Sequence, residues 1–112
     1  PLPGKQLSNL LMLDKLNMSS LLTKAYPGKG VIANHEDKIR LYFPGLGFSG
    51  EGDILLAHIT FDAIAYGALN FINKQEGSFL VRDMPDFYNE KTRLMIAAEL
   101  VARGFLNIEK IN

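Results

Sequence analysis

The sequence contains no cysteine, and its net charge is zero. The absence of cysteine excludes disulfide bonds and thiolate metal sites, and it leaves the redox compartment open. The 12 basic and 12 acidic side chains cancel at neutral pH. Because nucleic-acid-binding domains usually carry a basic excess, the composition gives no support to that class. Low-complexity tracts, which would indicate disorder, are also missing.

The length and the charge distribution indicate one domain over residues 1–112. Such a chain is long enough to bury a core but short for a catalytic α/β enzyme. Residues 1–40 hold six basic and three acidic groups, whereas residues 41–112 hold six and nine. We expect no signal peptide, because Pro1 is not followed by a basic segment and an apolar run. The cytoplasm is therefore favoured, although the compartment stays open.

The most apolar stretch covers residues 54–72. In the favoured interpretation, residues 54–59 form a buried strand and a helix begins at Thr60 or Asp62, either of which can cap it. The alternative is one long helix capped by Asp53. A membrane span is not expected, because Asp62 near the middle would be costly in hydrocarbon.

The first part of the chain predicts a helix followed by a hairpin. Leucines give residues 5–26 a wide apolar stripe, and the alternative is a break into two short helices at the polar residues around 17–20. Residues 30–43 predict a hairpin with a turn at 34–37. Its second strand alternates an apolar face with a polar face. The apolar face holds Ile39, Leu41 and Phe43, and the polar face holds Lys38, Arg40 and Tyr42.

Strands near 79–82 and 105–111 and a helix over 89–103 complete the predicted elements. Asn89 is placed to cap that helix and Gly104 to end it in the left-handed conformation. We therefore expect an α+β fold, in which one small antiparallel sheet, made of hairpin 30–43 and these two strands, packs against three helices.

Residues 45–50 match the dinucleotide fingerprint G-x-G-x-x-G through Gly45, Gly47 and Gly50. Glu51 and Asp53 place negative charge where a phosphate would lie. The sequence therefore favours a connecting loop over residues 44–52, with Leu46 and Phe48 as exposed apolar tips.

His58 and Asp62 are four residues apart, so a continuous helix would place them on one face, where a carboxylate can orient an imidazole. A strand would remove that alignment. We favour a buried histidine and a helix-capping aspartate, and we expect no metal site, no cofactor and no catalytic residue. The small-ligand hypothesis uses these two side chains together with the three glycines.

The second half of the chain resembles a winged helix-turn-helix arrangement. Residues 61–74 would be its first helix, 83–88 its second, 89–103 its recognition helix and 105–111 the start of its wing. Met84-Pro85 disrupts the second helix, and no second wing strand follows. The resemblance implies nucleic-acid contacts by Lys91, Arg93 and Arg103.

The leading functional prediction is a non-enzymatic protein-interaction or assembly module, a subunit or terminal domain of a larger complex. The leucine-rich first helix has more apolar surface than one face of a small core needs, which indicates a protein partner or a homo-oligomer. The expected partner-binding residues are Leu10, Leu13, Met18, Leu46 and Phe48. The alternatives are the winged-helix-like nucleic-acid binder and the small-ligand site.

Overall fold

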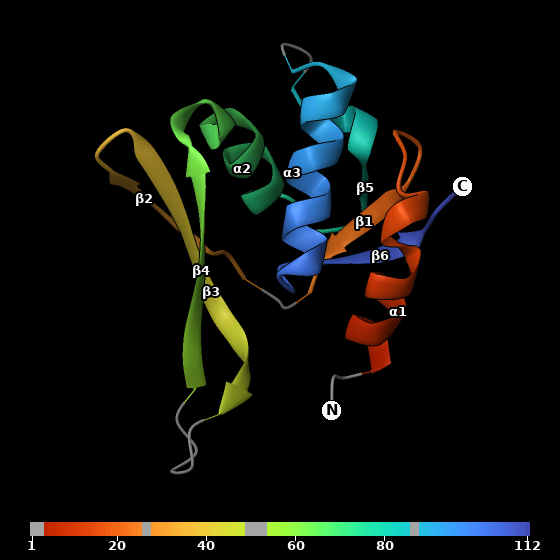
Figure 1. The fold of residues 1–112 in the computed structure, drawn as a ribbon, viewed down its shortest axis with the longest axis horizontal. Helices are drawn as coiled ribbons and strands as arrows, with labels where there is room; N and C mark the ends of the chain where they lie inside the picture. The colour runs from red at the N-terminus through yellow and green to blue at the C-terminus, as the bar shows by residue number, and fades with distance from the viewer. Residues whose placement is uncertain (1–3, 26–27, 49–53, 86–87) are drawn as a thin grey trace.

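The computed structural model describes residues 4–25, 28–48, 54–85 and 88–112. Four of its strands, β1 to β4, follow one another along the chain between helical elements (Figure 1). They are α1 (Gly4–Met12), η1 (Leu13–Lys15), β1 (Leu21–Lys24), β2 (Val31–His35), β3 (Lys38–Phe48), β4 (Ile54–Asp62), η2 (Ala63–Ala65), α2 (Tyr66–Asn73), β5 (Phe79–Leu80), η3 (Val81–Asp83), α3 (Glu90–Ala102) and β6 (Leu106–Lys110), where η marks a short 3-10 helix.

The strands form two three-stranded antiparallel sheets, in the orders β5-β1-β6 and β2-β3-β4. The α+β class is therefore confirmed, whereas the expected single sheet is wrong. Strands β5 and β6 do not join the hairpin, because β1 lies between them and supplies both with backbone partners. Figure 1 shows the two sheets side by side, with α3 in front of the β1 sheet.

The hairpin of β2 and β3 is confirmed, with Glu36 and Asp37 in the turn. Glu36 takes a positive φ of 59° there. The predicted faces of β3 are confirmed as far as residue 43, since the apolar side chains lie in the core. Beyond that point the expected loop over residues 44–52 is wrong as far as Phe48, because β3 continues to that residue and pairs with β4 again there after a register shift. Backbone pairing outweighs the local preference of its proline and glycines for a turn. Residues 49–52 of the expected loop lie outside the described residues.

The stretch that begins at Ile54 is a strand, as favoured, but it extends further than expected. Strand β4 runs to Asp62, opposite Lys38 of β3. Helix α2 begins only at Tyr66, after a 3-10 turn. Asp62 makes no capping hydrogen bond, and its carboxylate instead forms an ion pair with Lys38. The α-helix therefore starts later than expected, although Asp62 occupies the N-cap position of the 3-10 turn η2 that leads into it.

The predicted helix over residues 5–26 is confirmed only in its first part, because α1 ends at Met12 and residues 21–24 form β1. The polar residues between these elements build a turn. The backbone N–H of Asn17 donates to Oγ of Ser20 at 2.9 Å, and that of Ser19 donates to Oδ1 of Asn17 at 2.8 Å. Leu22 then lies fully buried in the core, between two strands that follow far later in the chain. Tertiary pairing thus outweighs the helical spacing of the leucines.

The C-terminal helix is confirmed. Oδ1 of Asn89 accepts from the N–H of Thr92 at the start of α3, and Gly104 follows its end with a φ of 88°. The winged-helix resemblance gains no support here, because β6 pairs with β1 and the described residues between β5 and α3 contain only the three-residue η3.

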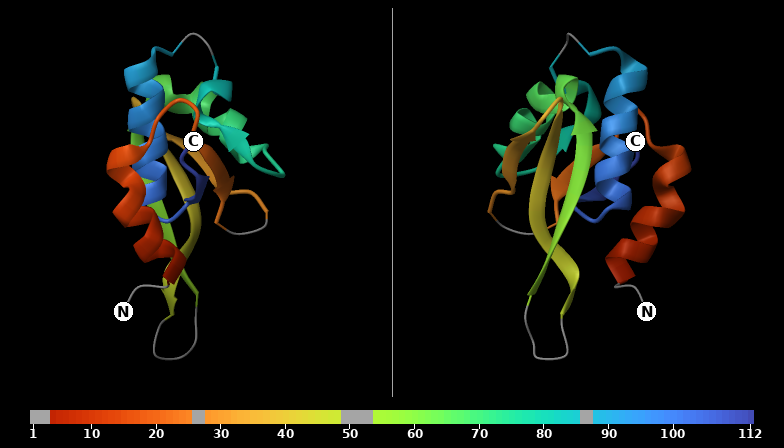
Figure 2. Two further views of the ribbon diagram at one scale, coloured as in Figure 1. Left: turned by 90° about the vertical axis from the view of Figure 1, so that its right-hand side faces the viewer. Right: turned by 60° about the vertical axis from the view of Figure 1, so that its left-hand side comes forward.

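Helix α3 occupies the middle of the molecule. Both Figure 1 and the right-hand view of Figure 2 place it between β4 and α1. Its buried residues Ile96, Ala97, Leu100 and Val101 belong to a core that also includes side chains from β1, β3, α2 and β6. No helix in the described parts of the chain is long and apolar enough to cross a membrane.

Candidate functional site

Helix α1 carries apolar side chains on two sides. One side faces the molecule, where Asn9 is fully buried and Met12 packs against the core. The other side holds Leu10 and Leu11, which are 38% and 71% exposed. Exposed leucines next to each other on a helix that is already docked are available for contact with another protein.

The other predicted partner-binding residues lie elsewhere. Leu13 and Met18 are partly buried and pack against the core, so most of their apolar surface is already used within the chain. Leu46 and Phe48 lie on β3, in the part of the hairpin that projects beyond the helices in Figures 1 and 2. The structure therefore does not bring all five residues together on one surface.

The residues of the small-ligand hypothesis do not form one site. Gly45 and Gly47 are part of β3, and Gly50 lies outside the described residues. His58 and Asp62 share a face of β4, but four residues of strand separate them by about 13 Å. The His58 ring lies 5.6 Å from that of Tyr42, whereas Asp62 binds Lys38. The aspartate therefore does not orient the imidazole, and the expected burial of His58 is wrong, because this residue is exposed.

The basic residues of the nucleic-acid hypothesis all lie on or next to α3. Arg93 donates from Nε and Nη2 to the carbonyl oxygen of Pro85, at 3.3 and 3.2 Å. Arg103 donates to Oε1 of Glu99 at 2.9 Å. Lys91 is exposed in the first turn of the helix. Two of the three cations are thus held by contacts within the chain.

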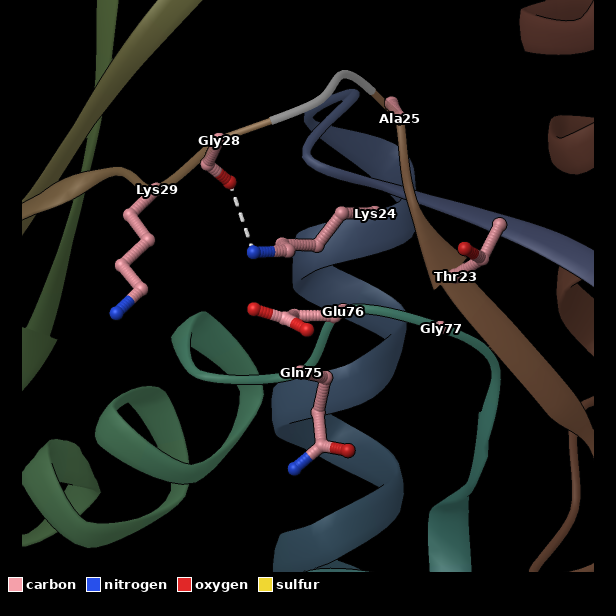
Figure 3. Close-up of a pocket in the computed structure, with 8 residues that line it drawn as sticks. All are labelled: Thr23, Lys24, Ala25, Gly28, Lys29, Gln75, Glu76 and Gly77. Atoms are coloured by element: carbon pink, nitrogen blue, oxygen red, sulfur yellow. Dashed lines mark hydrogen bonds between the residues drawn. The ribbon is translucent and has the colours of Figure 1, made fainter.

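A cavity of about 380 Å³ that the sequence did not indicate lies beside the end of β1 (Figure 3). Lys24 donates from Nζ to the carbonyl oxygens of Gly28, at 2.8 Å, and of Asn73, at 2.9 Å. Burial lowers the pKa of Lys24, the nearby Lys29 lowers it further, and the Glu76 carboxylate opposes the shift. Because Lys24 was expected on a helix, its approach to residues near the end of α2 could not be foreseen. The hydrogen bond of Lys24 to Asn73 connects β1 to α2.

A second cavity of about 380 Å³ lies between β4 and α3. We call it the β4–α3 groove, and its lining combines apolar side chains with charged ones. Phe61 and Ile96 are largely covered by the core, whereas Met95 is 60% exposed. The lining residues are Lys38, Thr60, Phe61, Asp62, Met95, Ile96 and Glu99. Nothing in the sequence indicates the groove, since its two walls lie more than thirty residues apart.

Comparison with protein-family models, with curated proteins and with solved structures finds no match to this chain.

Proposed function

We propose that the chain is a non-enzymatic protein-interaction or assembly module, a subunit or terminal domain of a larger complex. The observation that carries this proposal is the exposure of Leu10 and Leu11 on a helix whose opposite side is docked through Asn9. Each exposed apolar Å² contributes about 25 cal/mol when a partner covers it. A partner protein or a second copy that covers this part of α1 therefore gains apolar contact without rearranging the core.

The test is the association state of the purified chain over a wide concentration range, measured by light scattering and sedimentation. We expect a mass that rises with concentration, and a weaker association for Leu11→Gln. Ile64→Gln is the matched control, because Ile64 is also 71% exposed but lies on η2. Equal effects of the two substitutions would contradict a role for α1.

A partner other than a second copy is tested by a photo-crosslinking amino acid placed at position 11, with position 64 as the control. We expect position 11 to crosslink to one discrete protein within the assembly that contains the chain. A chain that stays monomeric and yields no crosslink specific to position 11 would overturn the proposal.

The nucleic-acid alternative is separated from this proposal by salt-dependent retention on duplex DNA. Phosphate contacts make binding fall steeply with salt. If Lys91 were a phosphate contact, Lys91→Gln would reduce both the retention and its salt dependence, whereas the interaction module predicts no such effect. The small-ligand alternative predicts a thermal shift with nucleotides that is lost in His58→Ala.

A further inference from the structure

The outer edge of β4 has unpaired backbone groups. Within the described residues β4 is an edge strand, because β3 alone pairs with it. A strand edge presents a row of free N–H and C=O groups, which is a template for another strand. Unlike many edge strands, β4 carries no proline or lysine along its nine residues. Neither of these residue types therefore hinders the pairing of another strand with this edge.

The register of the sheet identifies which groups face outward. Antiparallel neighbours alternate between hydrogen-bonded and non-hydrogen-bonded pairs. A two-residue turn joins His35 and Lys38 as a hydrogen-bonded pair, so the even-numbered residues of β3 bond to β2 and its odd-numbered residues bond to β4. The even-numbered residues of β4 then direct their N–H and C=O groups to the free edge. In the part of β4 nearest α2 these are both groups of His58 and Thr60 and the N–H of Asp62, whose C=O accepts in the first turn of η2.

A pair of hydrogen bonds on the opposite edge agrees with this alternation. Asn73 bonds both backbone groups of Gly30, accepting from its N–H at 2.7 Å and donating to its C=O at 2.8 Å. Gly30 is even-numbered and directly precedes β2, so its backbone groups point away from β3 as the alternation requires. There a side chain from α2 satisfies the outward groups. The C=O of Asp62 is used in the first turn of η2. Beside the outward groups of Thr60 and the N–H of Asp62, the β4–α3 groove opens instead.

From this edge and the groove beside it we infer a docking site for an extended peptide segment of a partner protein, which adds to the sheet as a strand antiparallel or parallel to β4. The groove volume of about 380 Å³ lies within the range of about 300–1,000 Å³ typical of ligand pockets. Main-chain hydrogen bonds to Thr60 and Asp62 supply affinity, and the groove accepts every second side chain of the peptide.

The lining of the groove determines the chemistry of that peptide. Phe61, Met95 and Ile96 form an apolar floor, which favours an apolar anchor residue. The charged lining groups are the Lys38 ammonium and the carboxylates of Asp62 and Glu99. Lys38 neutralises Asp62, and Arg103 uses Oε1 of Glu99, so Oε2 remains able to accept a hydrogen bond. The Arg103 guanidinium already pairs with this carboxylate, so a lysine two positions from the anchor, on the same face of the peptide strand, complements Oε2 as a hydrogen-bond donor.

This site differs from the surface on α1. Helix α3 lies between α1 and β4 in Figure 1 and in the right-hand view of Figure 2. The inference relies on the proposed function only for the class of partner, a polypeptide. Loss of association in Leu11→Gln and loss of peptide binding are therefore separate results, and either proposal can fail alone.

The test uses capped heptapeptides with an apolar residue at the centre, lysine two positions to either side and threonine elsewhere. The central residue is leucine, isoleucine, valine, methionine or phenylalanine in turn. We expect at least one of them to bind the whole chain at millimolar concentration or below. On binding, amide hydrogen exchange should slow at Thr60 and Asp62, and not at Ile32 and Asn34 on the β2 edge. Replacement of both lysines by glutamate should weaken binding several-fold.

Two controls separate strand addition from simple apolar contact. A peptide with the same side chains but N-methylated at alternate amides lacks the donors for the strand ladder, and we expect it not to bind. Thr60→Pro removes an edge N–H that the fold does not use, whereas Asn34→Pro does so on the opposite edge. Only Thr60→Pro should abolish binding. Met95→Glu should weaken binding about tenfold, and Val31→Glu should leave it unchanged.

Several results would overturn the inference. They are the failure of all five peptides to bind, equal binding of the N-methylated peptide, and protection at the β2 edge instead of the β4 edge. Without peptide, the amides of Thr60 and Asp62 could also become more protected from hydrogen exchange as the protein concentration rises. That result would identify a second copy of the chain as the occupant, and it would overturn the inference of a partner peptide.

Discussion

Asn9 on α1 and Asn107 on β6 lie 98 positions apart in the sequence and are joined by a side-chain hydrogen bond of 2.9 Å. The same Asn9 side chain accepts from the backbone N–H of Ile108 with its Oδ1, also at 2.9 Å. Asn9 is fully buried, so its bond to Ile108 forms away from water, whereas its bond to Asn107 is partly buried. An amide that donates and accepts in this way fixes the position of α1 along β6, and it leaves the leucines that follow on the outer side.

Replacement of Asn9 by leucine should destabilise the protein by about 1–3 kcal/mol, because the N–H of Ile108 and Oδ1 of Asn107 lose a buried partner. Urea unfolding followed by circular dichroism measures this change. Ser8→Ala, one position away on the same helix, should change the free energy of unfolding by less than about 0.5 kcal/mol. Equal losses would mean that α1 is not held through Asn9.

Gly30 and Gly77 form a matched pair for a test of close packing. A Cβ at Gly30 would lie 2.7 Å from Cδ1 of Leu41 and 2.9 Å from the carbonyl oxygen of Tyr42, whereas a Cβ at Gly77 would meet nothing within 4 Å. Gly30→Ala should therefore cost about 1–3 kcal/mol of stability. Gly77→Ala should leave the stability unchanged or raise it slightly. Thermal unfolding of both variants checks this difference, and a tolerated Gly30→Ala would contradict the tight approach of β2 to β3.

The hydroxyl of Tyr88 completes the first turn of α2. It accepts from the N–H of Ala68 at 3.2 Å and donates to the carbonyl oxygen of Ile64, two groups that would bond directly in a continuous α-helix. Tyr88→Phe leaves both groups without this bridge, so we expect a loss of about 1–3 kcal/mol in chemical denaturation. The exposed Tyr66, replaced by phenylalanine, is the control and should cost less than about 0.5 kcal/mol. Comparable losses of stability in Tyr88→Phe and Tyr66→Phe would show that the two hydrogen bonds of the Tyr88 hydroxyl do not specifically stabilise α2.

The ion pair between Lys38 and Asp62 makes stability depend on pH in the alkaline range. The hydrogen bond with Asp62, assisted by the carboxylate charge, raises the pKa of Lys38 above its ordinary value of 10.5. Because the folded pKa is the higher one, the stabilisation is fully present below pH 10.5 and is lost as the pH rises through the folded pKa. The melting temperature of the wild type should therefore approach that of Lys38→Met at strongly alkaline pH.

The control for this prediction is the same lysine substitution in an Asp62→Asn background. Without the carboxylate, the difference between lysine and methionine at position 38 should no longer vary with pH in this way. A difference that persists unchanged through the alkaline range in the wild-type background would show that the pair contributes nothing to stability, as is common for exposed ion pairs.

The sequence by itself determined those elements that depend only on residues close together in the chain. The alternation of apolar and polar residues in β3 specifies which face meets the core, since a strand turns successive side chains to opposite sides. Asn89 and Gly104 bound α3, because their side-chain and backbone preferences satisfy the helix ends without any distant partner. The α+β class follows from these elements together.

Only the tertiary structure decided the elements and surfaces that depend on residues far apart in the chain. Leucines spaced for a helix become β1 because β5 and β6 offer backbone hydrogen bonds on both sides, and Leu22 is buried there. The glycine-rich residues up to Phe48 extend β3 because β4 lies opposite them. The β4–α3 groove likewise requires two walls that meet only after folding. A pattern along the chain reports which residues prefer burial, but strand pairing and packing determine which surfaces remain uncovered.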